Sequence, residues 1–401
     1  MTWNWNTIWP LLVAIGIVLA VIPILGLYLT FIERKVAAWI QDRIGPNRVG
    51  PFGLLQAVAD GIKIFLKEQV IPDHVFKTVY FFAPTIGLIC AMLSIAVIPF
   101  GPASPTPSDG FRAIIAPGVD IGILFVMGVS SLSAYGIILG GWASNNKYSM
   151  YGAVRSCAQF ISYEIPLGLS LLGVIMATGS LNIESIVAAQ GDGIANWNIW
   201  WQPLAAIMFF TAALAETNRL PFDLPECEQE LVGGFHTEYS GIKFVLFFLA
   251  EYTHVVAVCF LTALLFLGGW HFPGLTGPVD SSLSGFLMRW MVLLAKVSLV
   301  FAVIVQLRWT LPRFRFDQLM GLAWCALIPL GIANFLGLVV VLSLDLPRWT
   351  LAPYSIALLF ASALINARQV TKRAKDLAAR SFALPSTARS AAVNAQPQLT
   401  R

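Results

Sequence analysis

Long apolar runs, separated by short polar segments, make up most of this chain. A helix that crosses a bilayer takes about 20 apolar residues, and eight stretches reach or approach that length, with a weaker ninth near the C-terminus. The pattern therefore predicts an all-α, polytopic bundle of membrane helices. The predicted spans are Ile8–Phe31, Val79–Phe100, Gly118–Gly140, Cys157–Thr178, the short Trp201–Ala215, Lys243–Gly268, Gly285–Gln306, Gln318–Ser343 and the weaker Leu351–Ala367.

The positions of the basic residues favour nine spans over eight and orient the bundle. Lys and Arg concentrate on the inner side of a membrane. With nine spans and the N-terminus outside, 21 basic residues fall on inner segments, and only Arg112, Arg289 and Arg348 fall on outer ones. With eight spans, the seven basic residues of the tail would be translocated. We therefore expect one integral-membrane domain over residues 1–370 and a basic, disordered inner tail over 371–401.

Composition narrows the function classes. The chain has only 25 basic and 21 acidic residues among 401, whereas a soluble chain of this length carries roughly 100 charged residues. This excludes a soluble globular enzyme, a disordered protein and a nucleic-acid binder. Five scattered cysteines without a C-x-x-C pair argue against a disulfide framework and a cysteine-based metal site. The sequence also has no P-loop and no dinucleotide-binding glycine motif, so we expect no redox centre on this chain itself.

The long inner loop after the first span contains an amphipathic stretch, Leu54–Val70. Apolar residues such as Val58 and Phe65 fall on one face, and Asp60 and Lys63 fall on the other, at helical spacing. This predicts a helix that lies in the membrane interface rather than crossing it. A surface helix with a solvated charged face is the alternative.

The loop between the fifth and sixth spans is acidic. Six carboxylates occur within 23 residues, and apolar neighbours such as Leu220 and Phe222 favour a loop packed into protein over a solvated loop. The next inner loop, Leu307–Asp317, is basic and aromatic. Its inner position alone explains the basic residues, and a docking surface for another subunit is the alternative explanation. The six acidic residues are Glu216, Asp223, Glu226, Glu228, Glu230 and Glu238.

Three ionisable residues fall inside predicted spans. By helical rise, Glu164, Glu251 and Lys296 lie roughly 10–15 Å from the inner surface, and each costs about 2.5–3.5 kcal/mol there if unpaired. Three such residues at one depth suggest a buried polar chain that conducts protons. A structural salt bridge between Lys296 and one of the glutamates is the alternative.

Five motifs, in order, resemble one family. They are Glu33-Arg34-Lys35, Gly45-Pro-Asn-Arg-Val-Gly-Pro-Phe-Gly53, Ala59-Asp-Gly-Ile-Lys63, Ala215-Glu216 with Pro221-Phe-Asp-Leu-Pro-Glu226, and Phe235-His-Thr-Glu-Tyr-Ser240. Over residues 8–370 the chain resembles the membrane-embedded quinone-site subunit of respiratory complex I. This family is called NADH dehydrogenase subunit 1, or the H subunit of NADH:quinone oxidoreductase.

The resemblance implies a subunit that closes a quinone chamber and couples quinone reduction to proton translocation. The implied partners are peripheral-arm subunits that carry FMN and iron–sulfur clusters, adjacent small membrane subunits, lipid and quinone as substrate, with no cofactor bound by this chain alone. By motif match, the chamber and its entrance would be formed by Glu33, Arg34, Asp60, Lys63 and Arg155. The proton path would be formed by Glu164, Glu216, Asp223, Glu226, Glu228, Glu230, Glu238, Tyr239, Glu251 and Lys296.

Two positions depart from the family pattern. Cys227 stands where Ala or Gly is usual, and Phe235 stands where Tyr is usual. The second change removes a hydroxyl, which puts any role of that group in proton transfer in doubt for this chain.

Two other functions remain open from the sequence. In the first, the chain is the equivalent subunit of a membrane-bound hydrogenase-type complex. In the second, it is a stand-alone ion transporter. The long charged inner loops suit docking to a partner better than free exposure, which favours a complex subunit. The chain is longer than organelle versions of the family, so we expect a bacterial inner (plasma) membrane.

Overall fold

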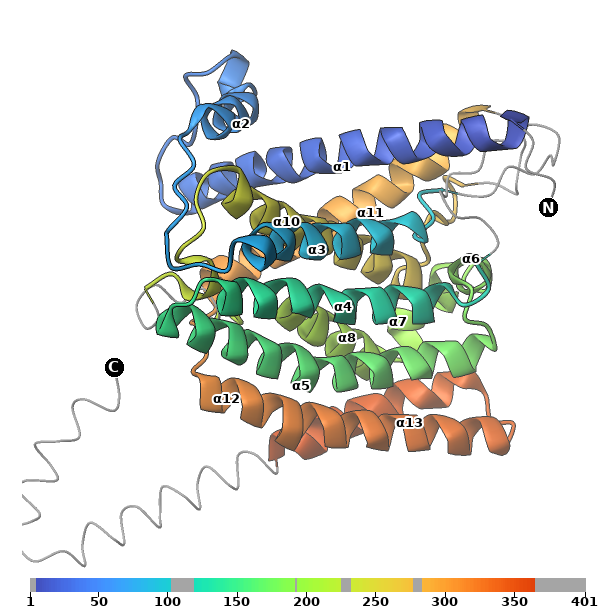
Figure 1. The fold of residues 1–401 in the computed structure, drawn as a ribbon. Coiled ribbons are helices and arrows are strands. Elements are labelled where there is room, and N and C mark those ends of the chain that lie inside the picture. The colour runs from blue at the N-terminus through green and yellow to red at the C-terminus, as the bar shows by residue number, and fades with distance from the viewer. Residues whose placement is uncertain (1–4, 102–118, 192, 225–231, 277–282, 365–401) are drawn as a thin grey trace, which may run out of the picture.

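The structure, a computed structural model, describes residues 5–101, 119–191, 193–224, 232–276 and 283–364, and regular structure within these ranges is helical. The all-α prediction is confirmed. The helices lie alongside one another in a bundle (Figure 1). The principal helices are α1 (Trp5–Ile40), α2 (Gln56–Leu66), α3 (Lys77–Ala96), α4 (Gly122–Ala143), α5 (Lys147–Thr178), α8 (Pro203–Glu216), α10 (Ile242–Phe266), α11 (Leu283–Thr310), α12 (Phe316–Gly321) and α13 (Ile328–Ser343).

Six helices in the described ranges are long and apolar enough to cross a bilayer. They include α3, α4, α5 and α10, most of α11, and Phe316–Ser343, in which a π-helical turn at Leu322–Leu327 joins α12 to α13. Helix α8 is apolar but shorter, with 14 residues. Residues 351–364 are also helical. Two short helices, α6 (Ile183–Ala188) and α7 (Asn198–Trp201), lie between α5 and α8.

Two helices extend well beyond the predicted apolar spans. Helix α1 continues to Ile40, so Glu33, Arg34 and Lys35 lie on the helix rather than opening a loop. Helix α5 begins at Lys147, ten residues before its predicted span, where the Asn146 side chain caps it by accepting a bond from the Tyr148 N–H. The length of an apolar run indicates only which part of a helix lies in lipid. The helix itself continues into polar sequence where the residues have high helix propensity.

The predicted fifth span, Trp201–Ala215, corresponds to α8, which starts two residues later, at Pro203. The short α7 ends just before it, and the helix breaks at Gln202. Proline is favoured in the first turn of a helix because the backbone N–H groups there have no partner within the helix, so a residue that lacks an N–H loses no hydrogen bond. The amphipathic prediction over Leu54–Val70 is realised as α2, which protrudes from one end of the bundle in Figure 1.

Helix α10 packs against α1, α3, α8 and α11, and α5 packs against α4, α8 and α13. The largest core lies between α5, α8, α10 and α11, and a second core joins α3 and α4 to residues 235–247. Small residues permit close approach: a Cβ on Gly136 of α4 would come within 2.9 Å of the backbone N of Gly87 on α3.

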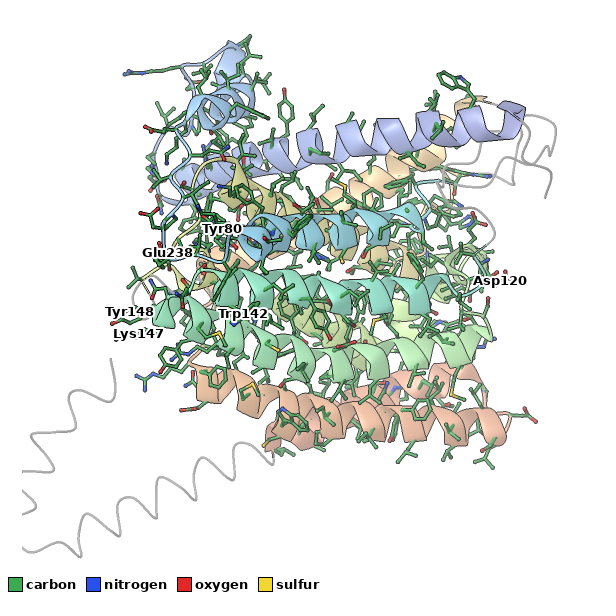
Figure 2. All side chains as sticks on the ribbon, in the orientation of Figure 1. Tyr80, Asp120, Trp142, Lys147, Tyr148 and Glu238 are labelled. Atoms are coloured by element: carbon green, nitrogen blue, oxygen red, sulfur yellow. The ribbon has the colours of Figure 1, made fainter. Side chains whose placement is uncertain are left out.

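The two ends of the bundle differ. One end, called the α2 end below, carries α2 and the residues Trp142, Lys147, Tyr148 and Glu238, whereas Asp120 lies at the opposite end (Figure 2). Helix α10 begins at the α2 end and finishes at the opposite end, beside α6 and α7. The position of a residue along α10 therefore indicates how far that residue lies from the α2 end.

Candidate functional site

The loop between α1 and α2 forms the wall of an open groove at the α2 end. The motif 45–53 turns tightly, since a Cβ on Gly53 would lie 2.1 Å from the Pro46 carbonyl oxygen and φ at Gly53 is +84°. Arg34 on α1 binds Asp60 on α2 through a Nη1–Oδ2 contact of 2.6 Å, and Gln56 Nε2 donates to the other Asp60 oxygen at 2.9 Å. The groove, of about 850 Å³, is lined by Arg34, Ala37, Ala38, Arg43–Arg48, Gln56 and Trp309.

A second cavity, of about 210 Å³, continues inward from this groove. Arg34, Ala37 and Trp309 line both volumes, so the two meet at these residues. The cavity is rich in opposite charges, unlike the apolar bundle around it. Its charged lining residues are Glu33, Arg34, Arg219, Asp223, Glu251 and Arg308.

Glu33 is the centre of an ion-pair cluster in this charged cavity. Its carboxylate accepts hydrogen bonds from Arg308 and, at 2.5 Å, from the Tyr252 hydroxyl, while Arg219 Nη1 lies 3.6 Å away. Glu33 follows the predicted span Ile8–Phe31. Burial by itself would raise the pKa of Glu33, but Arg219 and Arg308, together with the hydrogen bonds from Tyr252 and Arg308, hold that pKa below its ordinary value.

Arg219 is the cation that joins this cluster to the next carboxylate. Its guanidinium lies 3.9 Å from the centroid of the Tyr252 ring and interacts electrostatically with both Glu33 and Glu251. Although burial disfavours its charge, Tyr252, Glu33 and Glu251 together raise the pKa of Arg219 above its ordinary value. Its Nε and one Nη group make no hydrogen bond within the described residues, which leaves these donors for a ligand or water.

Two smaller cavities extend the charged cavity into the bundle. Asn218 and Glu251 line both the charged cavity and a cavity of about 30 Å³, called the middle cavity. Glu216, Thr217 and His254 line both the middle cavity and a mostly apolar one of about 40 Å³, called the deep cavity. Each has room for at least one water molecule. The groove and the three cavities thus form one series with shared lining residues.

Two neighbouring serines on α4 lie beside Glu216 and Glu164. Ser130 lines the deep cavity together with Glu216, and the Ser131 hydroxyl donates to the Glu164 carboxylate. The two carboxylates lie near enough to interact electrostatically. The structure therefore brings Glu33, Glu251, Glu216 and Glu164 into one sequence of neighbours.

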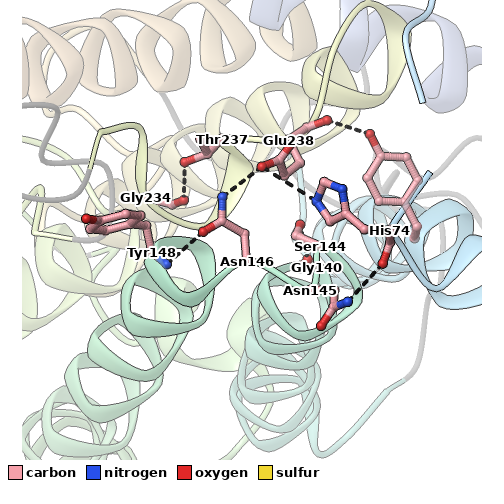
Figure 3. A network of polar contacts seen from close by, with 10 residues as sticks. His74, Gly140, Ser144, Asn145, Asn146, Tyr148, Gly234, Thr237 and Glu238 are labelled. Atoms are coloured by element: carbon pink, nitrogen blue, oxygen red, sulfur yellow. Dashed lines mark hydrogen bonds and ion pairs between the residues drawn. The ribbon is translucent and has the colours of Figure 1, made fainter. Parts of the chain in front are cut away.

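Glu238 belongs to a separate network at the α2 end (Figure 3), and Tyr239 packs beside it. The Glu238 carboxylate accepts a bond of 2.8 Å from Asn146 Nδ2 and lies 3.9 Å from His74 Nε2, and its carbonyl accepts from the Tyr80 hydroxyl at 2.7 Å. The Tyr239 ring stacks on Tyr80 with centroids 4.2 Å apart, and burial first, then Tyr80, raises the pKa of Tyr239. This network joins three segments of the α2 end.

The remaining site residues lie apart from the series of cavities, with one exception. Asp223 lines the charged cavity and binds Arg313 Nη2 at 2.9 Å, but Lys63 is exposed on α2 and Arg155 lies against the Phe316 ring. Glu226, Glu228, Glu230 and Cys227 lie outside the described residues.

The sequence predicted that Lys296 lies at the same depth as Glu164 and Glu251. In the structure, the Lys296 ammonium group lies at a different depth. Its Nζ donates to the carbonyls of Leu267, Gly269 and His271 at 2.7–2.8 Å, just beyond the end of α10. Glu251 lies in the other half of α10, nearer Ile242. The prediction failed because position within a span does not fix where a long, flexible lysine side chain ends.

Sequence reasoning missed four residues of the cavities. They are Tyr252, His254, Arg219 and Arg308. Tyr252 and His254 follow Glu251 on α10 at i+1 and i+3, and Arg219 and Arg308 are two of the 21 basic residues on inner segments. The sequence shows these positions, but the groups that meet in the cavities lie far apart in sequence. Among the described residues, no group of three or more His, Cys, Asp or Glu side chains is arranged to hold a metal.

Comparisons with known proteins give one consistent result. The NADH dehydrogenase family profile matches residues 13–339. The chain is 49% identical over 315 residues to the NADH-quinone oxidoreductase H subunit of Leptospira biflexa, covering 76% of this chain and 87% of the relative. It is 45% identical over 338 residues to the H 2 subunit of the same enzyme in Koribacter versatilis, covering 81% and 94%, and 45% identical to subunit 8 of Rhodothermus marinus, covering 81% and 95%. With its several membrane-length helices, the chain is a multi-pass integral membrane protein and belongs to the NADH dehydrogenase family, among the H subunits of NADH-quinone oxidoreductase.

Proposed function

We propose that this chain forms the quinone chamber of a proton-translocating NADH-quinone oxidoreductase together with peripheral-arm subunits. We propose further that it couples quinone reduction to proton translocation. The relatives are named as subunits of NADH-quinone oxidoreductase, which favours this over a hydrogenase-type complex or a stand-alone transporter. The observation that carries the proposal is the series of cavities, which runs from an open groove to carboxylates within the bundle.

The groove suits the entry of an amphipathic quinone. It is about 850 Å³ in volume, and apolar residues such as Trp309 and Ala37 border it beside Arg34 and Arg48. A quinone has an apolar tail and a headgroup whose two carbonyl oxygens accept hydrogen bonds. The unpartnered N–H groups of Arg219 lie in the next cavity, where they would bind such an oxygen or the waters around it.

The charged cavity would respond electrostatically to the redox state of the quinone. Reduction adds two electrons and requires two protons, and negative charge that forms in a poorly solvated cavity interacts strongly with nearby groups. Glu33, Arg219 and Glu251 are already coupled to one another, so a change in one alters the others. Protons would then move by way of Glu251, Glu216 and Glu164.

The other predicted members of the path enter the proposal with less support from geometry. Asp223 lines the charged cavity, and Glu226, Glu228 and Glu230 follow it closely in sequence. Glu238 and Tyr239 lie in their own network, and Lys296 hydrogen bonds to backbone carbonyls just after the end of α10. A part for these last three residues in proton transfer stays a prediction from the sequence.

We also propose the topology that the charges predict. The six long helices, with α1, α8 and residues 351–364, account for nine spans, and the N-terminus lies outside a bacterial plasma membrane. The α2 end is then the inner end, where the basic loops and the groove meet the peripheral arm. Arg43 and Arg48 would lie at that interface.

A pull-down of the tagged chain from its host membrane in mild detergent tests the proposal. We expect the eluate to reduce a soluble quinone with NADH and to give iron–sulfur EPR signals. Iron–sulfur signals without NADH activity would indicate a hydrogenase-type complex instead. A solitary, stable chain with neither property would favour a transporter and contradict the proposal.

A further inference from the structure

One buried histidine connects the middle cavity to the deep cavity. His254 lies three residues after Glu251 on α10, which places both side chains on the same helix face. That face runs along both cavities, with His254 the one α10 residue that lines both. On the opposite wall, the end of α8 contributes Glu216 and Thr217 to both cavities. Glu251, His254 and Glu216 therefore share the middle cavity, and His254 and Glu216 also border the deep cavity.

The Nε2 atom of His254 is buried and finds no hydrogen-bond partner among the described residues. A buried polar atom without a partner costs about 1–3 kcal/mol, so a native site of this kind normally holds water. Both cavities that meet at His254 have room for water, at about 30 and 40 Å³. A water molecule there would satisfy Nε2 and reach the Glu216 carboxylate.

The charged groups nearest to the ring are carboxylates. The ionisable groups that line the two cavities are Glu251 on α10 and Glu216 at the end of α8, and Glu164 on α5 lies behind Ser131 of α4. The cations Arg219 and Arg308 belong to the charged cavity on the far side of Glu251. No Lys or Arg among the described residues lines the two cavities at His254, so an imidazolium there would face carboxylates rather than other cations.

We propose that His254 is a proton-transfer residue between Glu251 and Glu216, acting through water held at the junction of the middle and deep cavities. A proton that leaves the Glu251 carboxyl group binds to Nε2 and converts the neutral ring to imidazolium. The imidazolium returns the proton through water to the Glu216 carboxylate and becomes neutral again. No other bond changes. This inference rests on the proposed function, and it adds to the carboxylate path a residue of another kind.

The test uses the intact complex in host membranes with His254→Gln, which keeps a polar side chain but cannot carry a proton near neutral pH. Turnover from NADH to a soluble quinone is normalised to NADH oxidation by an artificial acceptor that takes electrons from the peripheral arm. We expect turnover about tenfold lower and a larger solvent isotope effect in D₂O than in the unchanged complex, because proton transfer then limits the rate. His254→Glu, which restores an ionisable group, should recover part of the rate.

Two results would overturn the proposal: wild-type turnover and isotope effect in His254→Gln, or a slower rate with no change in isotope effect, which marks a packing role. If His254→Gln does not assemble, His254→Asn is measured in the same way and decides. Cys259→Ala, a buried change on α10 outside the two cavities, is the matched control and should match the unchanged complex. A defect in Glu251→Gln beside a normal His254→Gln overturns only this inference, whereas full pumping in both Glu251→Gln and Glu164→Gln contradicts the proposed function.

Discussion

The carboxylate of Glu33 on α1 accepts a hydrogen bond from the guanidinium of Arg308 on α11, 275 residues further along the chain. The same carboxylate bonds to Tyr252 on α10 and lies beside Arg219 after α8. One buried acid thus contacts residues from three other segments of the chain. Because these groups also line the charged cavity, the stability of the α2 end and the electrostatics of the site depend on the same residue.

Glu33→Gln should therefore destabilise the protein. The change leaves Arg308 without this carboxylate and removes one of the charges that balance Arg219, and breaking a buried ion pair costs about 3 kcal/mol or more. We expect a lower thermal unfolding temperature of the purified complex. Glu68→Gln, at an exposed position, is the control and should leave it unchanged. Equal unfolding temperatures for Glu33→Gln and the unchanged complex would contradict the cluster.

The same cluster predicts how stability depends on pH. The pKa of Glu33 is lower in the folded protein than its ordinary value of 4.5, so the ionised form is favoured by folding. Its contribution is present above that ordinary value and is lost as pH falls through the lower, folded value. The difference in unfolding temperature between the unchanged complex and Glu33→Gln should be constant from about pH 8 to about pH 5.5 and shrink in more acid solution. A difference that grows on acidification has the wrong sign for this account.

Arg34→Ala tests the junction between the groove and the charged cavity. The Arg34 side chain is 55% exposed in its pair with Asp60, and exposed pairs contribute about 0–1 kcal/mol, so stability should hardly change. Since Arg34 borders both volumes, we expect the KM for a soluble quinone to rise several-fold with a smaller effect on kcat. An unchanged KM would remove Arg34 from the entry route. Lys63→Ala, further along the exposed face of α2, should have less effect.

Lys296→Met separates a structural role from a role in proton transfer. Losing three bonds to carbonyl oxygens, each worth about 1 kcal/mol or more, should lower the yield and unfolding temperature of the complex. The complexes that do assemble should pump the same number of protons per electron. A stable complex with reduced pumping would instead support the prediction, made from the sequence, that Lys296 belongs to the proton path.

The apolar pattern was enough to predict the helical fold and the positions of most helices. It failed at the ends, because α1 and α5 continue into polar sequence where lipid no longer requires apolar residues. For the fifth span, Trp201–Ala215, the prediction was close, because α8 begins only two residues later, at Pro203. Hydropathy indicates whether a segment lies in lipid or in water, and it gives little information about where the helix begins, breaks or ends.

The candidate site was only partly predictable, for a related reason. Motifs identified Glu33, Arg34 and Asp60, and the Arg34–Asp60 pair forms as a local contact between neighbouring helices. Tertiary contacts could not be predicted. Nothing in the sequence indicates that Glu33 binds Arg308, or that the Lys296 ammonium binds the carbonyls after α10. Which carboxylates share a cavity is decided by helix packing, and therefore Glu238 separates from Glu216 although both stand in one acidic loop.

The central claim is that carboxylates within the bundle carry protons that quinone reduction drives. Glu251→Gln and Glu164→Gln test it most directly, in complexes reconstituted into vesicles, with Glu68→Gln as the control. Proton uptake or release per electron is measured together with NADH-driven quinone reduction, and electron transfer to an artificial acceptor reports assembly. We predict that both variants assemble, and that pumping and coupled quinone reduction fall by about tenfold. Full pumping in both variants would contradict the claim.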